Sequence, residues 1–179
     1  MADEADANIA QPGGYIPPQN QQYPAPGNST FNLNDPQQRQ QALQWLAQAQ
    51  SGQTQQLPHD QMHHAYRQWS QQAPPQQVAD ATSHAMQQMP QDQQQSFAQQ
   101  VTGWLGQHGI TPQQAGVQQT NPQQMSPQDV GKMVGHAQQQ NPDALHQLFS
   151  PNGLLGNKAV QLGLAGVLAY AASKTMGGK

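Results

Sequence analysis

The sequence contains no cysteine, and this absence excludes several kinds of site at once. The chain can form no disulfide, no thiolate nucleophile and no cysteine-ligated zinc centre. The lack of cysteine does not determine the cellular compartment, because it fits a reducing cytosol and a bacterial envelope equally well. Residues 1–19 are acidic and include no apolar run of the kind that a secretory signal needs. We therefore expect no signal peptide and favour a cytoplasmic location.

Charge is also scarce. Only 8% of the residues are charged, against about 25% in an ordinary globular domain. Six basic and nine acidic residues give a net charge of −3, and three of the acids lie among the first six residues. Non-specific binding of nucleic acid requires several cations on one face to neutralise phosphates. The composition therefore predicts no nucleic-acid partner.

Apolar residues make up 34% of the chain, below the usual ~45–50%, so one large core around the whole chain is not expected. Alternating β-branched or aromatic runs are missing, and no strand is predicted. Glutamine is abundant instead, at 41 of 179 residues. Glutamine is a good helix former that solvates a helix without charge. A surface of this kind lacks charge repulsion, which makes self-association an expected property.

Prolines recur directly after a polar or turn residue and before a glutamine-rich stretch. Proline is favoured at the first position of a helix, and Asp, Asn or Ser before it is a good N-cap. The pattern predicts an all-α fold of short proline-initiated helices that form a small C-terminal bundle, preceded by a disordered N-terminal tail. The predicted helices cover residues 35–51, 58–72, 75–89, 91–108, 127–140, 142–149 and 157–176. Their apolar stripes include Trp45, Trp69 and Trp104, which are predicted to anchor the core.

Composition divides the chain into four parts. Residues 1–33 form the predicted disordered tail, rich in Pro, Gly and Gln. Residues 34–56 have a narrow apolar stripe, which predicts an isolated or loosely packed helix and a linker. Residues 57–152 are predicted to be a glutamine-rich multi-helix region. Residues 153–179 are predicted to form an Ala- and Gly-rich apolar helix packed on the bundle.

Two tyrosines in the tail, Tyr15 and Tyr23, lie close to prolines. Proline-rich segments of this kind are recognised by aromatic grooves in a polyproline II conformation. A flexible solubilising arm is the favoured interpretation of the tail, and docking in such a groove is the alternative.

The last apolar run, residues 159–172, is the longest in the chain. The uncharged stretch between Lys158 and Lys174 has 15 residues, roughly 22 Å of helix at ~1.5 Å per residue. A membrane span needs about 20 apolar residues, and the five strongly apolar residues here contribute only about −2 kcal/mol to insertion. A helix that is apolar on most sides is usually buried, and Gly163 and Gly166 permit close backbone approach.

We therefore predict a buried C-terminal helix that packs against the helices at 91–108, 127–140 and 142–149. The lysines at its ends keep a membrane surface as the alternative environment. The residues predicted to make interaction or membrane contacts are Leu154, Leu155, Leu162, Leu164, Ala165, Gly166, Leu168 and Ala169.

Histidine supplies the one candidate for a metal site. His59 and His63 are spaced i, i+4 on a predicted helix, as two metal ligands are in zinc proteases. The residue after His59 is Asp60 rather than the Glu of that motif, and a third ligand is also needed. We favour solvent-facing histidines, so no metal is assigned and His59 and His63 are kept only as candidates.

No catalytic residues and no cofactor are predicted. Most carboxylates after the tail lie within about three residues of a predicted helix start, where they stabilise the helix dipole. The sequence has no G-x-S-x-G nucleophile motif and no phosphate-binding glycine loop. We expect a non-catalytic structural or protein-interaction protein that binds a protein partner or a second copy of itself. The alternative is a peripheral membrane-associated protein held by its C-terminal helix.

Overall fold

The computed structural model describes residue 33 and residues 35–150 and 152–177, with side chains as far as Lys174. This part of the chain contains helices and no strand, which confirms the predicted all-α class. The α helices are α1 (Pro36–Gln50), α2 (His59–Gln72), α3 (Pro75–Gln87), α4 (Gln91–Gln107), α5 (Pro127–Gln140), α6 (Pro142–Leu148) and α7 (Lys158–Gly177). Single 3₁₀ turns are η1 (Thr54–Gln56), η2 (Pro122–Gln124) and η3 (Leu154–Gly156). The predicted disordered tail lies outside the described residues, apart from Leu33.

Local sequence fixes where the helices start. Proline stands in the first turn of α1, α3, α5 and α6, as the sequence pattern predicts. Asp35 caps α1 by accepting the N–H of Gln37 at 2.8 Å. Ser126 and Asp129 form a reciprocal capping box at the start of α5. Because such caps are local, the helix ends lie within two residues of the predicted ones.

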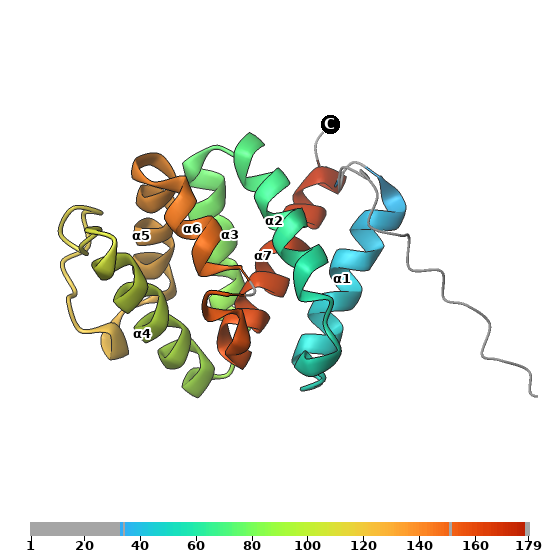
Figure 1. The fold of residues 1–179 in the computed structure, drawn as a ribbon, viewed down its shortest axis with the longest axis horizontal. Helices are drawn as coiled ribbons and strands as arrows, with labels where there is room; N and C mark the ends of the chain where they lie inside the picture. The colour runs from blue at the N-terminus through green and yellow to red at the C-terminus, as the bar shows by residue number, and fades with distance from the viewer. Residues whose placement is uncertain (1–32, 34, 151, 178–179) are drawn as a thin grey trace, which may run out of the picture.

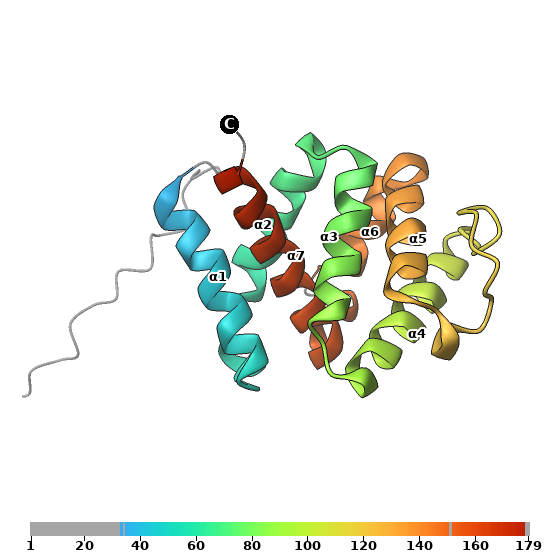
Figure 2. The same ribbon diagram turned by 180° about the vertical axis from the view of Figure 1, so that it is seen from behind.

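Helix α7 lies in the middle of the bundle. It packs between α1 and α3, running beside α1 in the opposite direction, and it also contacts α2 and α4 (Figures 1 and 2). Helix α5 packs against the far side of α3, and α6 packs against α5 and α4. The predicted contact of α7 with the helix at 91–108 is present. The main partners of α7 are α1 and α3 rather than α5 and α6, the helices at 127–140 and 142–149 that the sequence predicts as its neighbours.

Small residues explain these neighbours. A Cβ atom added to Gly131 of α5 would lie 2.5 Å from the carbonyl oxygen of Ala79 in α3, so only glycine permits this approach. On the other side of α3, a Cβ on Gly166 of α7 would lie 2.7 Å from the Cβ of Ala85. Gly163 meets the ring of Phe97 in the same way. Helix α3 is thus held closely between α5 and α7.

The middle of α7 is buried on every side, whereas Lys158 at its start and Lys174 near its end are exposed. Residues 159–169 are all buried, and Ala171 and Ala172 follow them. Its five large apolar side chains each contribute about 1.5–3 kcal/mol through burial. Gln161 is buried among them, and its Nε2 donates to the carbonyl oxygen of Leu155 at 2.6 Å. Among the described helices, none combines the length and the apolarity that crossing a bilayer requires.

Helix α1 is packed more closely than its narrow apolar stripe indicates. Ala42, Trp45 and Ala49 are buried, and α1 lies along α7. Leu33, the last residue of the predicted tail, is also buried in the core. Helix α1 packs more closely than predicted because its alanines contribute to the face that contacts α7. In the sequence these alanines add little to the stripe of large apolar residues.

Candidate functional site

The residues predicted to contact a partner or a membrane lie inside the bundle. Leu154 is partly buried, and the other seven are buried within the chain: Leu155, Leu162, Leu164, Ala165, Gly166, Leu168 and Ala169. They contact the surrounding helices, because α7 has neighbours on all sides. In this structure these side chains contribute to the core rather than to an exposed contact surface.

The two candidate metal ligands point to different partners. His59 Nε2 lies 3.3 Å from the carbonyl oxygen of Thr54. His63 Nε2 donates to the carbonyl oxygen of His146 at 2.9 Å. The described residues hold no group of three His, Cys, Asp or Glu that could bind a metal ion. The histidines instead connect α2 to η1 and to α6.

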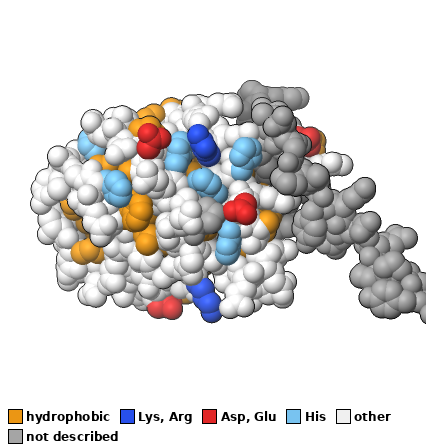
Figure 3. Space-filling model, viewed as in Figure 1, with side chains coloured by type: hydrophobic (Ala, Val, Ile, Leu, Met, Phe, Trp, Pro, Cys, Tyr) orange, Lys and Arg blue, Asp and Glu red, His pale blue; other side chains and the backbone are white. Residues whose placement is uncertain are grey.

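His63 belongs to a polar cluster between α2 and α6, which we call the α2–α6 junction. Ser70 Oγ lies 3.1 Å from His146 Nε2, and the Nε2 of Gln138 donates to the carbonyl oxygen of Ser70 at 2.9 Å. The ring of Tyr66 meets His146 edge-on at a centroid distance of 6.3 Å. Figure 3 shows histidine side chains gathered on this face, among mostly uncharged polar groups. The junction therefore connects helices that are distant in the sequence.

Burial controls the ionisation of the junction. It lowers the pKa of His63 and of His146, and the positive charge of Arg67 adds to the effect at both rings. Two weaker effects raise the pKa of His63: its hydrogen bond to the His146 carbonyl oxygen and the negative charge of Asp60. The negative charge of Asp143 raises the pKa of His146 in the same way. The lowered pKa values keep both rings neutral at pH 7, which suits their fixed hydrogen bonds.

His146 lies between Asp143 and Ser70 in space, as the histidine of a catalytic triad lies between its acid and its serine. The distances and the burial of these groups, however, are those of a structural link. Ser70 is 1% exposed, and its hydroxyl also lies within hydrogen-bond distance of the Arg67 carbonyl oxygen, at 3.2 Å. The Asp143 side chain is 87% exposed, and its Oδ1 is 4.0 Å from His146 Nδ1. A nucleophile must reach its substrate, and its base must be oriented by a close third group. Neither condition is met by these three residues.

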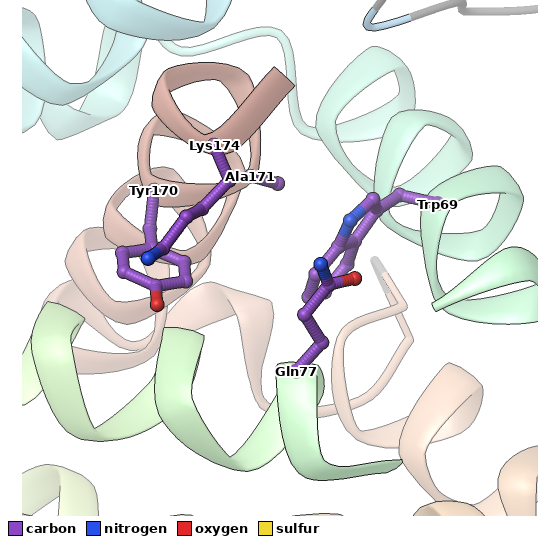
Figure 4. Close-up of a pocket in the computed structure, with 5 residues that line it drawn as sticks. All are labelled: Trp69, Gln77, Tyr170, Ala171 and Lys174. Atoms are coloured by element: carbon purple, nitrogen blue, oxygen red, sulfur yellow. The ribbon is translucent and has the colours of Figure 1, made fainter. Parts of the chain in front are cut away.

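A small hollow lies between the ends of α2 and α7 and the start of α3. It is lined by Trp69, Gln77, Tyr170, Ala171 and Lys174, and we call it the Trp69–Lys174 groove. Figure 4 shows Trp69 and Gln77 on one side and Tyr170 with Lys174 on the other. Lys174 Nζ lies over the Tyr170 ring, 5.4 Å from its centroid. The hollow has a volume of about 100 Å³.

Both aromatic walls of the groove are supported from behind. The ring of Trp69 packs on Tyr66 at a centroid distance of 6.1 Å, and the ring of Tyr170 packs on His84 at 5.1 Å. Both side chains are only partly buried. Trp69 is thus a groove wall as well as the core anchor that the sequence predicted. The sequence analysis did not predict this site; the signal that could have indicated it is the pair Tyr170 and Lys174, one turn apart at the end of an apolar helix.

A second hollow, of about 510 Å³, lies at the ends of α4 and α5. Its walls are mainly polar and include His108, His136 and Gln140. His108 stacks on Trp104 at a centroid distance of 4.8 Å, and Trp104 Nε1 donates to the carbonyl oxygen of Ala144 at 3.0 Å. Ligand sites are usually lined by apolar and aromatic groups, so the Trp69–Lys174 groove is the better candidate of the two.

Comparison of the chain with known protein families, with curated proteins and with solved structures finds no match. A function for the chain is therefore inferred from the groove and from the α2–α6 junction.

Proposed function

We propose that this chain is a non-catalytic protein-interaction protein and that partners bind in the Trp69–Lys174 groove. The observation that carries the proposal is the pair of partly exposed rings, Trp69 and Tyr170, which face one hollow from two helices. Partly exposed Trp and Tyr are enriched at protein interfaces, because each combines a large apolar surface with a polar tip. Gln77 and Lys174 add polar groups at the edge of the groove.

The size of the groove favours a peptide over a small molecule. Pockets that enclose a drug-sized ligand measure about 300–1,000 Å³, whereas this hollow measures about 100 Å³. A space of this size takes one side chain or ring. An extended peptide inserts single side chains and leaves its other residues outside, so it fits such a groove.

The α2–α6 junction supports a non-catalytic role. His146 and Ser70 form the one close His–Ser side-chain contact among the described residues, and Ser70 is a buried residue of α2. A general base acts only within hydrogen-bond reach of the proton that it removes from a substrate. In this geometry His146 reaches a serine that also lies against a main-chain carbonyl oxygen.

The surface favours protein partners, a second copy of the chain included. With 8% charged residues, the chain has little electrostatic repulsion to keep copies apart. Leu43, at 40%, is the one exposed large hydrophobic side chain among the described residues, so binding is not expected through a broad apolar patch. With six basic residues in the whole chain, the dense basic face that nucleic acid requires is not expected.

The alternative of a membrane association through α7 has less support. Val160, Leu164 and Leu168 of this helix are fully buried by the neighbouring helices. Insertion would first have to remove α7 from the core, at a cost of about 1.5–3 kcal/mol for each large side chain. That cost exceeds the gain from inserting the same side chains, about 0.3–0.6 kcal/mol each.

A displayed library of extended peptides tests the proposal. The full chain is used as bait, with Tyr170→Ala/Lys174→Glu as the groove variant and Lys132→Glu, an exposed site on α5, as the matched control. We expect peptides to be enriched on the wild type and on Lys132→Glu but not on the groove variant. Equal enrichment on all three proteins, or enrichment on none, would contradict the proposal. Circular dichroism at 222 nm checks that the variants are folded.

A further inference from the structure

We infer that the Trp69–Lys174 groove is occupied by the proline-rich segment of this same chain, residues 12–27, which reads PGGYIPPQNQQYPAPG. The inference rests on the proposed function of the groove and names its occupant. It gives the groove an internal ligand that a partner's segment must displace.

The chemistry of the groove fits proline. Proline-rich segments bind between aromatic rings, because the ring of proline packs flat against them and the extended backbone is already ordered. Trp69 and Tyr170 stand on opposite sides of the hollow (Figure 4). The segment offers the adjacent pair Pro17 and Pro18, and three further prolines at 12, 24 and 26.

Hydrogen-bond donors are present at the same place. The backbone carbonyl groups of an extended proline-rich segment have no partner within the segment. In the part of the chain that is described, neither the indole N–H of Trp69 nor the side-chain amide of Gln77 makes a hydrogen bond. By contrast, the indole N–H of Trp104 donates to the Ala144 carbonyl oxygen at 3.0 Å. The groove thus presents donors that an extended backbone can use.

The chain enters the bundle near the groove. Leu33 is buried, and the start of α1 lies beside the end of α7, at the end of the bundle where α2 also ends (Figures 1 and 2). Trp69 belongs to the last turn of α2. The 15 residue steps from Pro18 to Leu33 span about 46 Å at ~3.1 Å per residue. Helix α7 has 20 residues, or about 30 Å at ~1.5 Å per residue. The segment can therefore reach the groove of its own molecule.

The segment 12–27 carries no charged side chain, so charge does not oppose its placement beside Lys174, and the acidic residues that precede it are opposite in sign to this lysine. The residues before Leu33 carry three acidic side chains, Asp3, Glu4 and Asp6, and no basic one. The groove has Lys174 at its edge. A tether also raises the effective concentration of the segment at the groove, so an intramolecular contact is favoured over one with a second copy.

The indole N–H signals of the full-length, ¹⁵N-labelled chain test the inference. The chain has three tryptophans, and the signal of Trp69 is assigned with Trp69→Phe. We replace the four prolines at 17, 18, 24 and 26 by alanine. The Trp69 signal is expected to shift, while the signal of Trp104 stays in place. The matched control replaces Gln19, Gln21 and Gln22 by alanine and is expected to leave both signals unchanged.

A synthetic peptide of residues 12–27, added to the proline-replaced chain, is expected to return the Trp69 signal toward its wild-type position. An unchanged Trp69 signal on proline replacement overturns the inference. So does a difference between wild type and variant that disappears on dilution, because the segment would then come from a second copy.

The two proposals fail in different ways. If proline replacement leaves Trp69 unchanged while library peptides still shift its signal, only the internal occupant is wrong. If the library yields no groove-dependent peptide and no peptide shifts Trp69, the proposed function is wrong as well.

Discussion

The contact between Gly166 of α7 and Ala85 of α3 offers a sharp test of how the bundle is packed. A Cβ on Gly166 would lie 2.7 Å from the Cβ of Ala85 and 3.1 Å from its Cα. Gly166→Ala therefore forces α3 and α7 apart. Gly103→Ala is the matched control, since Gly103 is an exposed residue of α4 and an added Cβ there meets nothing within 4 Å.

Two opposing effects set the magnitude. Replacing a helical glycine by alanine stabilises a helix by about 1 kcal/mol, and this gain applies to both variants. Overpacking of a core costs about 1–3 kcal/mol, and this cost applies only to Gly166→Ala. The difference between the two variants is therefore about 2 kcal/mol in the free energy of unfolding, with Gly166→Ala the less stable. For a chain of this size the difference corresponds to roughly 4–8 °C in Tm.

Urea unfolding followed by circular dichroism at 222 nm measures the difference. The double variant Gly166→Ala/Ala85→Gly removes the Ala85 Cβ that makes the closest contact. Its loss of unfolding free energy is therefore expected to be about 1 kcal/mol smaller than the sum of the losses in the two single variants. Equal stability of Gly166→Ala and Gly103→Ala, or a double variant with no coupling, would refute the packing of α7 on α3.

Three further predictions concern local interactions. Ser126→Ala removes the N-cap of α5 and is expected to lower the free energy of unfolding by about 1 kcal/mol in urea unfolding; no loss would contradict the capping role. The pKa values of His63 and His146 are lowered from 6.5, so the unfolded chain binds protons more readily than the folded one. The stability that the two neutral histidines contribute is fully present above pH 6.5, and it is lost as the pH falls through their folded-state pKa values. Urea unfolding between pH 7.5 and 5 checks this, and a variant with both histidines replaced by glutamine is expected to depend less on pH. Arg67→Gln removes a charge that lowers both pKa values, so it is expected to weaken the same dependence; an unchanged or steeper pH profile in either variant contradicts it.

The positions of the helices were predictable from the sequence because they depend on neighbouring residues. Proline in the first turn and the pair Ser126 and Asp129 act within a few residues of one another. The burial of α7 was predictable for a similar reason. A helix that is apolar on most sides has no face suited to water.

The neighbours of α7 were not predictable in the same way. Gly131 and Gly135 of α5 pack on α3 around Ala79, about 50 residues earlier in the chain. This pairing draws α5 to α3 and leaves the place beside α7 to α1. A single sequence shows which glycines permit close approach, but the partner of each glycine depends on the tertiary arrangement.

The groove was hidden from sequence analysis because its walls come from three helices. Trp69 and Tyr170 are 101 residues apart, and each lies at the edge of an apolar stripe that predicts a core position. The link between His146 and Ser70 spans 76 residues and likewise follows from the fold. Docking of the proline-rich tail in an aromatic groove was the alternative interpretation of the tail, and a candidate groove could be proposed only from the three-dimensional structure.

Photo-crosslinking tests the central claim most directly. In one variant a photoreactive amino acid replaces Gln77 at the edge of the groove. In a second variant of the same chain, the control, it replaces the exposed Lys132 of α5. Mass spectrometry then identifies the crosslinked residues in the monomer. The account predicts crosslinks from position 77 to residues 12–27 of the same chain and none of these from position 132. Crosslinks to residues 12–27 that are equally abundant from both positions, or absent from position 77, would contradict it.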